Sequence, residues 1–372
     1  MSVKKSTIIF LALLFVSCGK KEAQNQGTNT FYSVRKLGEV ELELVKKKTI
    51  VLQNSVQQSI GLPLYKVEFS SEGNLYFFDI RKSSFLVFDS SGVFLKSFGR
   101  YGRGPKEFEQ VMGYTLDQND NLYVYDDLQR LVKVFNQNLE LINTKEIDNT
   151  AYFITSHDMV VHDSNLIFGI LESGMNSRRG DPNLLIQSPP LMIVDIKNLN
   201  EERFLGTYDP YLKEIKSFYN RPLFAFDNGA RTLLVSHQNT YRFQEFELKG
   251  GKRINYFGVK DETFGEGQVA AERGANKRKR YMETLSESDN QKVFYTNQYL
   301  GNFYINGTED WFETKDLNDL NYYLAVYSRK DYQLMDVIPF QYRLIGVYNE
   351  QFYFIEDEDP DNFRIGVYEI VK

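Results

Sequence analysis

Cysteine is nearly absent from this sequence. The 372 residues include one cysteine, Cys18, so no disulfide can form within a single chain. Tryptophan occurs once and proline nine times, which excludes collagen-like and proline-rich disordered classes. The only imidazoles belong to His157, His162 and His237. With so few nitrogen and sulfur ligands, the sequence predicts no metal site and no cofactor.

An excess of positive charge is also missing. Lysine and arginine number 44 against 50 aspartates and glutamates, a net charge of -6. A chain of this balance is not expected to bind nucleic acid. Long apolar runs are lacking too, because Ile8–Val16 is far shorter than the roughly 20 residues that span a bilayer as a helix. Flanked by Lys4 and Lys5, that run predicts a secretory signal peptide over residues 1–17.

The end of the signal contains the single cysteine. Phe15-Val16-Ser17-Cys18 resembles the lipobox of bacterial lipoproteins, which implies cleavage before Cys18 and attachment of lipid to its thiol. Several acyl chains hold a protein stably on a membrane, whereas one is marginal. The alternative is a secreted protein in which Cys18 is incidental. Residues 18–30 are polar and predict a flexible tether, and Gly19 in place of aspartate favours the outer membrane.

Two segments of the body repeat. Asn74–Asp79 matches Asn121–Asp126, and Phe88 matches Phe135 at the same offset of 47 residues. A period of about 40 to 50 residues with several short strands per unit is typical of propeller blades. Aromatic and β-branched segments bounded by glycine, asparagine and serine support hairpins rather than helices.

The same rhythm predicts an all-β, six-bladed β-propeller over residues 31–372 as one domain. Four-stranded units are expected over 64–98, 114–146, 154–208, 223–259 and 292–338, the third widened by an insert at 173–190. Residues 344–371 hold only three strands. The missing strand is predicted at 48–52, so that the N-terminal strand closes the last blade and removes open sheet edges.

The link between the first two units carries a family resemblance. Phe98–Phe108, followed by Leu116-Asp117, Asn121–Asp126 and Arg130–Phe135, resembles the NHL-type repeat, although Lys106 stands where glycine is usual. With the lipobox, the chain is similar to six-bladed, NHL/TolB-like propeller lipoproteins of Bacteroidetes-type bacteria, many of unknown function. This resemblance implies the fold and an envelope location, but no activity, because propellers host unrelated functions.

The Gly99–Phe108 link is also a candidate ligand site. Its backbone N–H groups, with Arg100, Arg103 and Glu107, suit anion binding. The alternative is a purely structural link between blades, with Phe108 in the core.

Further candidates lie in long connections. Trp311, between Asp310 and Glu313, is a candidate for stacking on a sugar ring, or a core-covering side chain. The basic run 277–280 suits an acidic partner or a solvated surface, and the acidic run 356–361 suits a hairpin tip or weak calcium binding.

These observations predict a lipid-anchored cell-envelope module that binds or scaffolds a protein or glycan partner. The binding face would be the mouth of the central channel and its long loops. The alternative is an envelope hydrolase or lyase in which carboxylates from several blades converge at that mouth. Two carboxylates in a deep channel pocket would favour the enzyme, and a shallow aromatic mouth would favour binding.

Overall fold

The structure is a computed structural model. It describes residues 31–33, 40–53, 60–61, 64, 66–147, 152–172, 189–197, 202–214, 221–227, 229–238, 240–258, 289–307, 320–359 and 361–372. The predicted signal peptide, the tether with Cys18, the basic run 277–280 and Trp311 lie outside these residues. Within the described residues, no helix is both long and apolar enough to cross a membrane.

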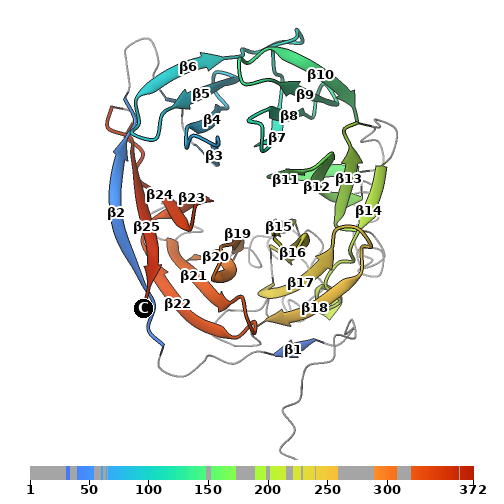
Figure 1. The fold of residues 1–372 in the computed structure, drawn as a ribbon, viewed down its shortest axis with the longest axis vertical. Helices are drawn as coiled ribbons and strands as arrows, with labels where there is room; N and C mark the ends of the chain where they lie inside the picture. The colour runs from blue at the N-terminus through green and yellow to red at the C-terminus, as the bar shows by residue number, and fades with distance from the viewer. Residues whose placement is uncertain are drawn as a thin grey trace, which may run out of the picture.

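Six sheets form a closed ring, with the first strand of each sheet nearest the centre (Figure 1). Blade 1 comprises β3 (Glu68–Phe69), β4 (Leu75–Asp79), β5 (Ser84–Phe88) and β6 (Phe94–Phe98), and blade 2 comprises β7 (Val111–Leu116), β8 (Leu122–Asp126), β9 (Leu131–Phe135) and β10 (Leu141–Glu146). Blade 3 comprises β11 (Tyr152–His162), β12 (Asn165–Glu172), β13 (Leu191–Asp195) and β14 (Glu202–Leu205). Blade 4 comprises β15 (Pro222–Asp227), β16 (Thr232–His237), β17 (Arg242–Glu247) and β18 (Arg253–Gly258). Blade 5 comprises β19 (Asp289–Tyr295), β20 (Tyr299–Gly307), β21 (Leu320–Ser328) and β22 (Leu334–Phe340). The all-β, six-bladed prediction is confirmed.

The last blade combines an early strand with the C-terminal strands. Its strands lie in the order β2 (Glu43–Val51), β25 (Arg364–Val371), β24 (Gln351–Asp357), β23 (Arg343–Tyr348), so the N-terminal strand closes the ring as predicted. The predicted start at Lys48 is wrong, because β2 begins at Glu43. Three consecutive lysines and a bulge between Lys46 and Lys48 hide the strand's alternation in the sequence.

Two other expected boundaries are also wrong. The first strand of blade 1 was expected from residue 64, but only Glu68–Phe69 pairs with β4. The first strand of blade 2 begins at Val111, ahead of the expected Tyr114, with a register shift between Val111 and Gly113. Hydrophobic pattern locates a strand, whereas its ends depend on where a partner's backbone is within reach.

Blade 4 carries an additional strand that the sequence did not predict. The short β1 (Tyr32–Ser33) pairs parallel with β18, outside the blade. The guanidinium of Arg242 lies over the ring of Phe31 at 4.3 Å and over the ring of Tyr211 at 3.7 Å. Tyr211 belongs to the one-turn helix α3 (Tyr211–Glu214). Cation–π contacts therefore fasten the N-terminal segment to blade 4.

The core lies between neighbouring blades. Every residue of β4 and β5 is buried, since both faces of a middle strand are covered by adjacent blades. The outer strands β6 and β10 instead alternate between exposed and partly buried positions. Between blades 1 and 2, the rings of Phe85, Phe98 and Phe135 surround the fully buried Phe108 at centroid distances of 5.5 to 6.2 Å.

The two ends of the ring differ in their connections. Because the four strands of a blade alternate in direction, turns between first and second or third and fourth strands lie at one end, here the short-turn face. The longest of these is 196–201. Connections between second and third strands and between blades join strand ends at the opposite end, here the long-loop face. The longest of these are 52–67, 173–190, 206–221 and 259–288.

Candidate functional site

The central channel contains a cavity of about 200 Å³. First strands of five blades line it, which are β3, β11, β15, β19 and β23. Most of the residues that line it are apolar, but four charged side chains from blades 1, 3 and 5 also belong to the lining: Lys66, Glu68, Asp158 and Lys292. Small-molecule sites usually combine apolar lining residues with a few polar groups, although this cavity is smaller than the roughly 300 to 1,000 Å³ typical of such pockets.

Lys66 is bound on two sides. Its ammonium lies 2.7 Å from Glu68 Oε1 and donates to the carbonyl of Tyr114 at 2.9 Å. The hydroxyl of Tyr114 donates in return to the carbonyl of Lys66 at 2.6 Å. This reciprocal pair joins the inner edges of blades 1 and 2, so Lys66 and Glu68 have a structural role in addition to facing the cavity.

Lys292 is held differently. Its ammonium donates to the carbonyl of Ile345 in blade 6 at 3.3 Å. Burial lowers its pKa, Lys66 lowers that pKa further, and Asp158 and Glu68 raise it. A lysine with a lowered pKa loses its proton more readily than an exposed one, which makes its charge sensitive to any ligand in the cavity.

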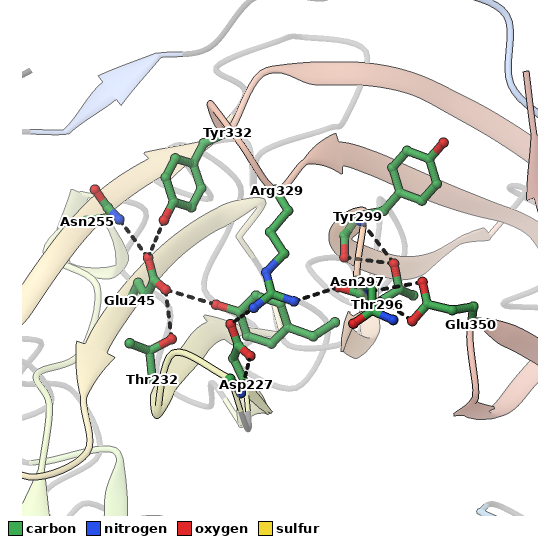
Figure 2. Close-up of polar contacts among 12 residues, drawn as sticks. Asp227, Thr232, Glu245, Asn255, Thr296, Asn297, Tyr299, Arg329, Tyr332 and Glu350 are labelled. Atoms are coloured by element: carbon green, nitrogen blue, oxygen red, sulfur yellow. Dashed lines mark hydrogen bonds and ion pairs between the residues drawn. The ribbon is translucent and has the colours of Figure 1, made fainter. Parts of the chain in front are cut away.

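A polar network joins blades 4 and 5 beside the cavity (Figure 2). The buried carboxylate of Glu245 accepts hydrogen bonds from Thr232 Oγ1 at 2.8 Å, Asn255 Nδ2 at 2.6 Å and Tyr332 Oη at 2.8 Å. The hydroxyl of Tyr295, which lines the cavity, donates to the same carboxylate at 3.2 Å. Burial and then the Glu245 charge raise the pKa of Tyr295, so this phenol stays protonated as a donor.

Two further contacts extend this network along the short-turn face (Figure 2). Arg329 pairs with Asp227 of blade 4 and donates to the carbonyl of Thr296 at 3.0 Å. The carboxylate of Glu350 in blade 6 accepts from the backbone N–H of Asn297 at 2.8 and 2.9 Å. These bonds satisfy turn backbone between successive blades, which indicates a structural role.

The Gly99–Phe108 link lies on the long-loop face between β6 and β7. Arg100 pairs with Glu107 Oε1 at 2.6 Å, and the backbone N–H of Gly104 donates to Glu107 Oε2 at 2.8 Å. The Gly104 bond and then the Arg100 bond lower the pKa of Glu107. Arg103 binds Glu109 Oε2 at 2.9 Å. The N–H of Gly104 proposed for an anion is thus occupied by the link's own carboxylate.

Side chains of blade 2 also bind the backbone of this link. Lys133 donates to the carbonyls of Gly104 and Glu107, and its ammonium lies 5.3 Å from the centre of the Phe108 ring. Gln129 donates to the carbonyl of Gly102 at 3.0 Å. Burial lowers the pKa of Lys133. These contacts support the structural role considered for this link. Its two arginines remain on the surface.

A family model described as "6-bladed beta-propeller" (DUF5128) matches residues 48–341. The chain belongs to this family. A solved structure of a DUF4221 family member from Bacteroides vulgatus superposes with a TM-score of 0.68 at 12% identity, covering 90% of this chain and 99% of that one. A protein from Bacteroides fragilis described as exported superposes with a TM-score of 0.60 at 15% identity, covering 92% and 100% of the two chains. No curated protein matches the sequence.

Three of the predicted site residues lie in the described part of this propeller family member. Arg100, Arg103 and Glu107 lie together on the long-loop face, whereas Trp311 and Cys18 fall outside the described residues. Ligand binding by any of them stays a prediction. The acidic run is partly structural, since Glu356 accepts from Tyr368 Oη at 2.6 Å.

The sequence reasoning missed the channel residues. Lys66 falls inside a predicted strand. A charged residue in the first strand of a blade indicates a channel-lining position, because that strand faces the channel. Asp158 and Lys292 belong to blades whose repeat is too diverged to align with the first two. Nothing in their local sequence indicates that they share a cavity with Lys66.

Proposed function

We propose that this propeller is a lipid-anchored recognition or scaffolding module of the bacterial cell envelope, with a protein or glycan partner. Two observations support the location. The N-terminal pattern ending in Cys18 has the order of a lipoprotein signal. A Bacteroides fragilis protein described as exported has a similar fold over almost the whole chain.

The observation that carries the binding role is the distribution of connections between the two faces. Between β2 and β25, every connection longer than 196–201 joins strand ends at the long-loop face, where the exposed arginines of the 99–108 link also lie. Long connections on a rigid scaffold are where binding residues concentrate, because the scaffold holds them in place at little cost to the fold.

The location is tested with Cys18→Ala expressed beside the native protein in the source bacterium. We expect the native protein in the membrane fraction, with an acyl mass on the N-terminal peptide, and the variant in the soluble fraction. Affinity purification of the native protein from detergent-solubilised envelope should recover a partner. The Cys18→Ala variant, mixed with membranes before they are solubilised, should recover the same partner. An unmodified thiol in the native protein contradicts the anchor, and repeated recovery of no partner and no glycan contradicts the recognition role.

The central cavity favours a second candidate, a hydrolase or lyase acting on a glycan or peptide. The specific observation is that Glu68 and Asp158, from separate blades, line the same cavity. Two carboxylates of different environment are the usual acid and base of glycoside hydrolysis. Activity on envelope glycan or peptide that is lost in Asp158→Asn but kept in Glu350→Gln, a carboxylate of the short-turn face, would support it. Equal activity in both variants would refute it.

A further inference from the structure

We propose that the surface around the 99–108 link is a docking site for an acidic polypeptide segment of a partner protein. The proposal rests on the proposed recognition function and deepens it by naming the surface and the chemistry of the partner. We name this the link surface. It consists of nine exposed side chains from three segments of blades 1 and 2, namely Ile80, Arg81, Lys82, Arg100, Tyr101, Arg103, Lys106, Leu128 and Arg130.

The three segments are contiguous. The link packs against the turn of blade 1, since a Cβ on Gly99 would lie 3.2 Å from the carbonyl of Ser83. On its other side the link contacts the turn of blade 2, where Gln129 donates to Gly102. Both turns connect second and third strands, so they open on the long-loop face together with the link. The exposed side chains therefore belong to one surface.

The charge of the link surface opposes that of the whole protein. Six of its nine side chains are basic, on a chain of net charge -6. The carboxylates of the same segments are engaged locally. Glu107 and Glu109 bind Arg100 and Arg103, and the buried Asp126 accepts from the backbone N–H of Glu109 at 2.7 Å. An acidic segment is the complementary partner, and its approach would be accelerated by this local field.

The link surface also includes one aromatic and two aliphatic side chains. Tyr101 is 67% exposed, Leu128 56% and Ile80 46%. Tyrosine and arginine are the residue types that most often dominate protein interfaces. Three separate apolar tips offer little area for insertion into lipid, which favours a polypeptide over a membrane surface.

The arginines are held in position before any partner arrives. Arg100 is 80% exposed and Arg103 78% exposed, yet each donates through Nε to a glutamate, at 2.7 and 2.9 Å. The Nη2 of Arg100 also lies 2.6 Å from Glu107. Side chains that are already ordered lose less conformational entropy on binding, which increases affinity.

The test compares two triple variants of the full chain with equal change of charge. The first is Arg81→Glu, Lys106→Glu and Arg130→Glu, three exposed link-surface residues whose side chains form no hydrogen bond or ion pair within the described residues. The control is Lys249→Glu, Lys252→Glu and Lys330→Glu on the short-turn face, which are exposed and whose side chains likewise form no hydrogen bond or ion pair in the described part of the chain. Equal unfolding temperatures would show that both variants are folded.

The probe is a fluorescein-labelled copolymer of glutamate and tyrosine, measured by fluorescence anisotropy. A glutamine–tyrosine copolymer and vesicles of phosphatidylglycerol with phosphatidylethanolamine serve as the alternative ligands. We expect the Kd for the acidic copolymer to rise at least about tenfold in the link-surface variant, and by less than about twofold in the control. A separate Tyr101→Ala, Leu128→Ala variant should weaken binding about fivefold with little change in salt dependence.

Equal weakening in both triple variants, or no binding of the acidic copolymer, overturns the proposal. Binding of vesicles without binding of copolymer overturns it in favour of a membrane surface. Failure here is distinguishable from failure of the proposed function. If the link-surface variant still captures the envelope partner that the native protein captures, the recognition function stands and only the assignment of this surface is wrong.

Discussion

The stability of this propeller should fall between neutral and mildly acidic pH because of one buried histidine. His237, in β16 of blade 4, is fully buried and packs against Tyr208 with ring centroids 4.8 Å apart and the ring planes tilted by 35°. Burial lowers its pKa from the ordinary 6.5 to about 3. The unfolded chain takes up a proton below about pH 6.5, whereas the folded chain stays neutral at this position until about pH 3.

The sign and size follow from this difference. A depressed folded pKa means that the contribution of His237 to stability is complete above about pH 6.5 and is lost progressively as the pH falls toward 3. With an unfolded pKa of about 6.5, the loss at pH 5 is about 2 kcal/mol, since each unit of difference is worth about 1.4 kcal/mol.

The assay compares the native chain with His237→Phe, which keeps a ring against Tyr208 but cannot titrate. Urea unfolding near pH 7.5 and near pH 5 gives four free energies. We expect the native chain to lose about 2 kcal/mol more than the variant over this interval, whatever their absolute difference. Parallel losses in the two proteins would refute the reasoning.

A direct titration provides an independent reading. The chain has three histidines, so selective labelling gives three imidazole signals and the variant identifies the one that belongs to His237. That signal should remain at the neutral position down to pH 5. Titration of this signal near pH 6.5 would show that the ring is accessible and that burial does not set its pKa.

Three further outcomes are expected. Phe108→Ala should destabilise the protein by about 3 to 5 kcal/mol in urea unfolding, because it empties the aromatic core between blades 1 and 2; a loss below about 1 kcal/mol would contradict that packing. Gly102→Ala should cost about 1 to 3 kcal/mol, since φ is +146° and a Cβ would lie 2.3 Å from Glu107 Oε2, whereas Gly250→Ala, with φ outside the positive region, is the milder control. Deletion of residues 1–51 should yield aggregates in size-exclusion chromatography, because it leaves the edge of β25 unpaired; a stable monomer would show that closure by β2 is dispensable.

The fold was predictable where each blade repeats locally. The shared pattern indicated a turn followed by a strand in two places. The structure has β4 within Asn74–Asp79 and β8 within Asn121–Asp126. The added β1 was not predictable, since two residues in a parallel pair with β18 leave no periodic signal. The early start of β2 was hidden because Lys46 and Lys48 flank a bulge, which breaks the alternation that sequence reasoning depends on.

The candidate site was predictable only in part. Glycine spacing and charge drew attention to Arg100, Arg103 and Glu107, but not to the fact that Glu107 accepts the Gly104 N–H. Ile80 and Leu128 join the same surface because the turns that carry them pack against the link, which adjacent sequence does not show.

By itself, the sequence determined the strand-forming segments, the repeated unit and the pairing of the N-terminal strand with an incomplete last blade. Local alternation of apolar residues and turn residues at fixed spacing is enough for the segments and the repeated unit, since each depends on neighbours within one hairpin. The closing pair follows instead from the strand count, because a blade of three strands leaves an edge that the early strand can cover. Only the tertiary structure decided that Lys66, Asp158 and Lys292 face one cavity. Closing a ring brings the first strands of all blades around a common axis, so residues separated by hundreds of positions become neighbours for a reason that no local pattern contains.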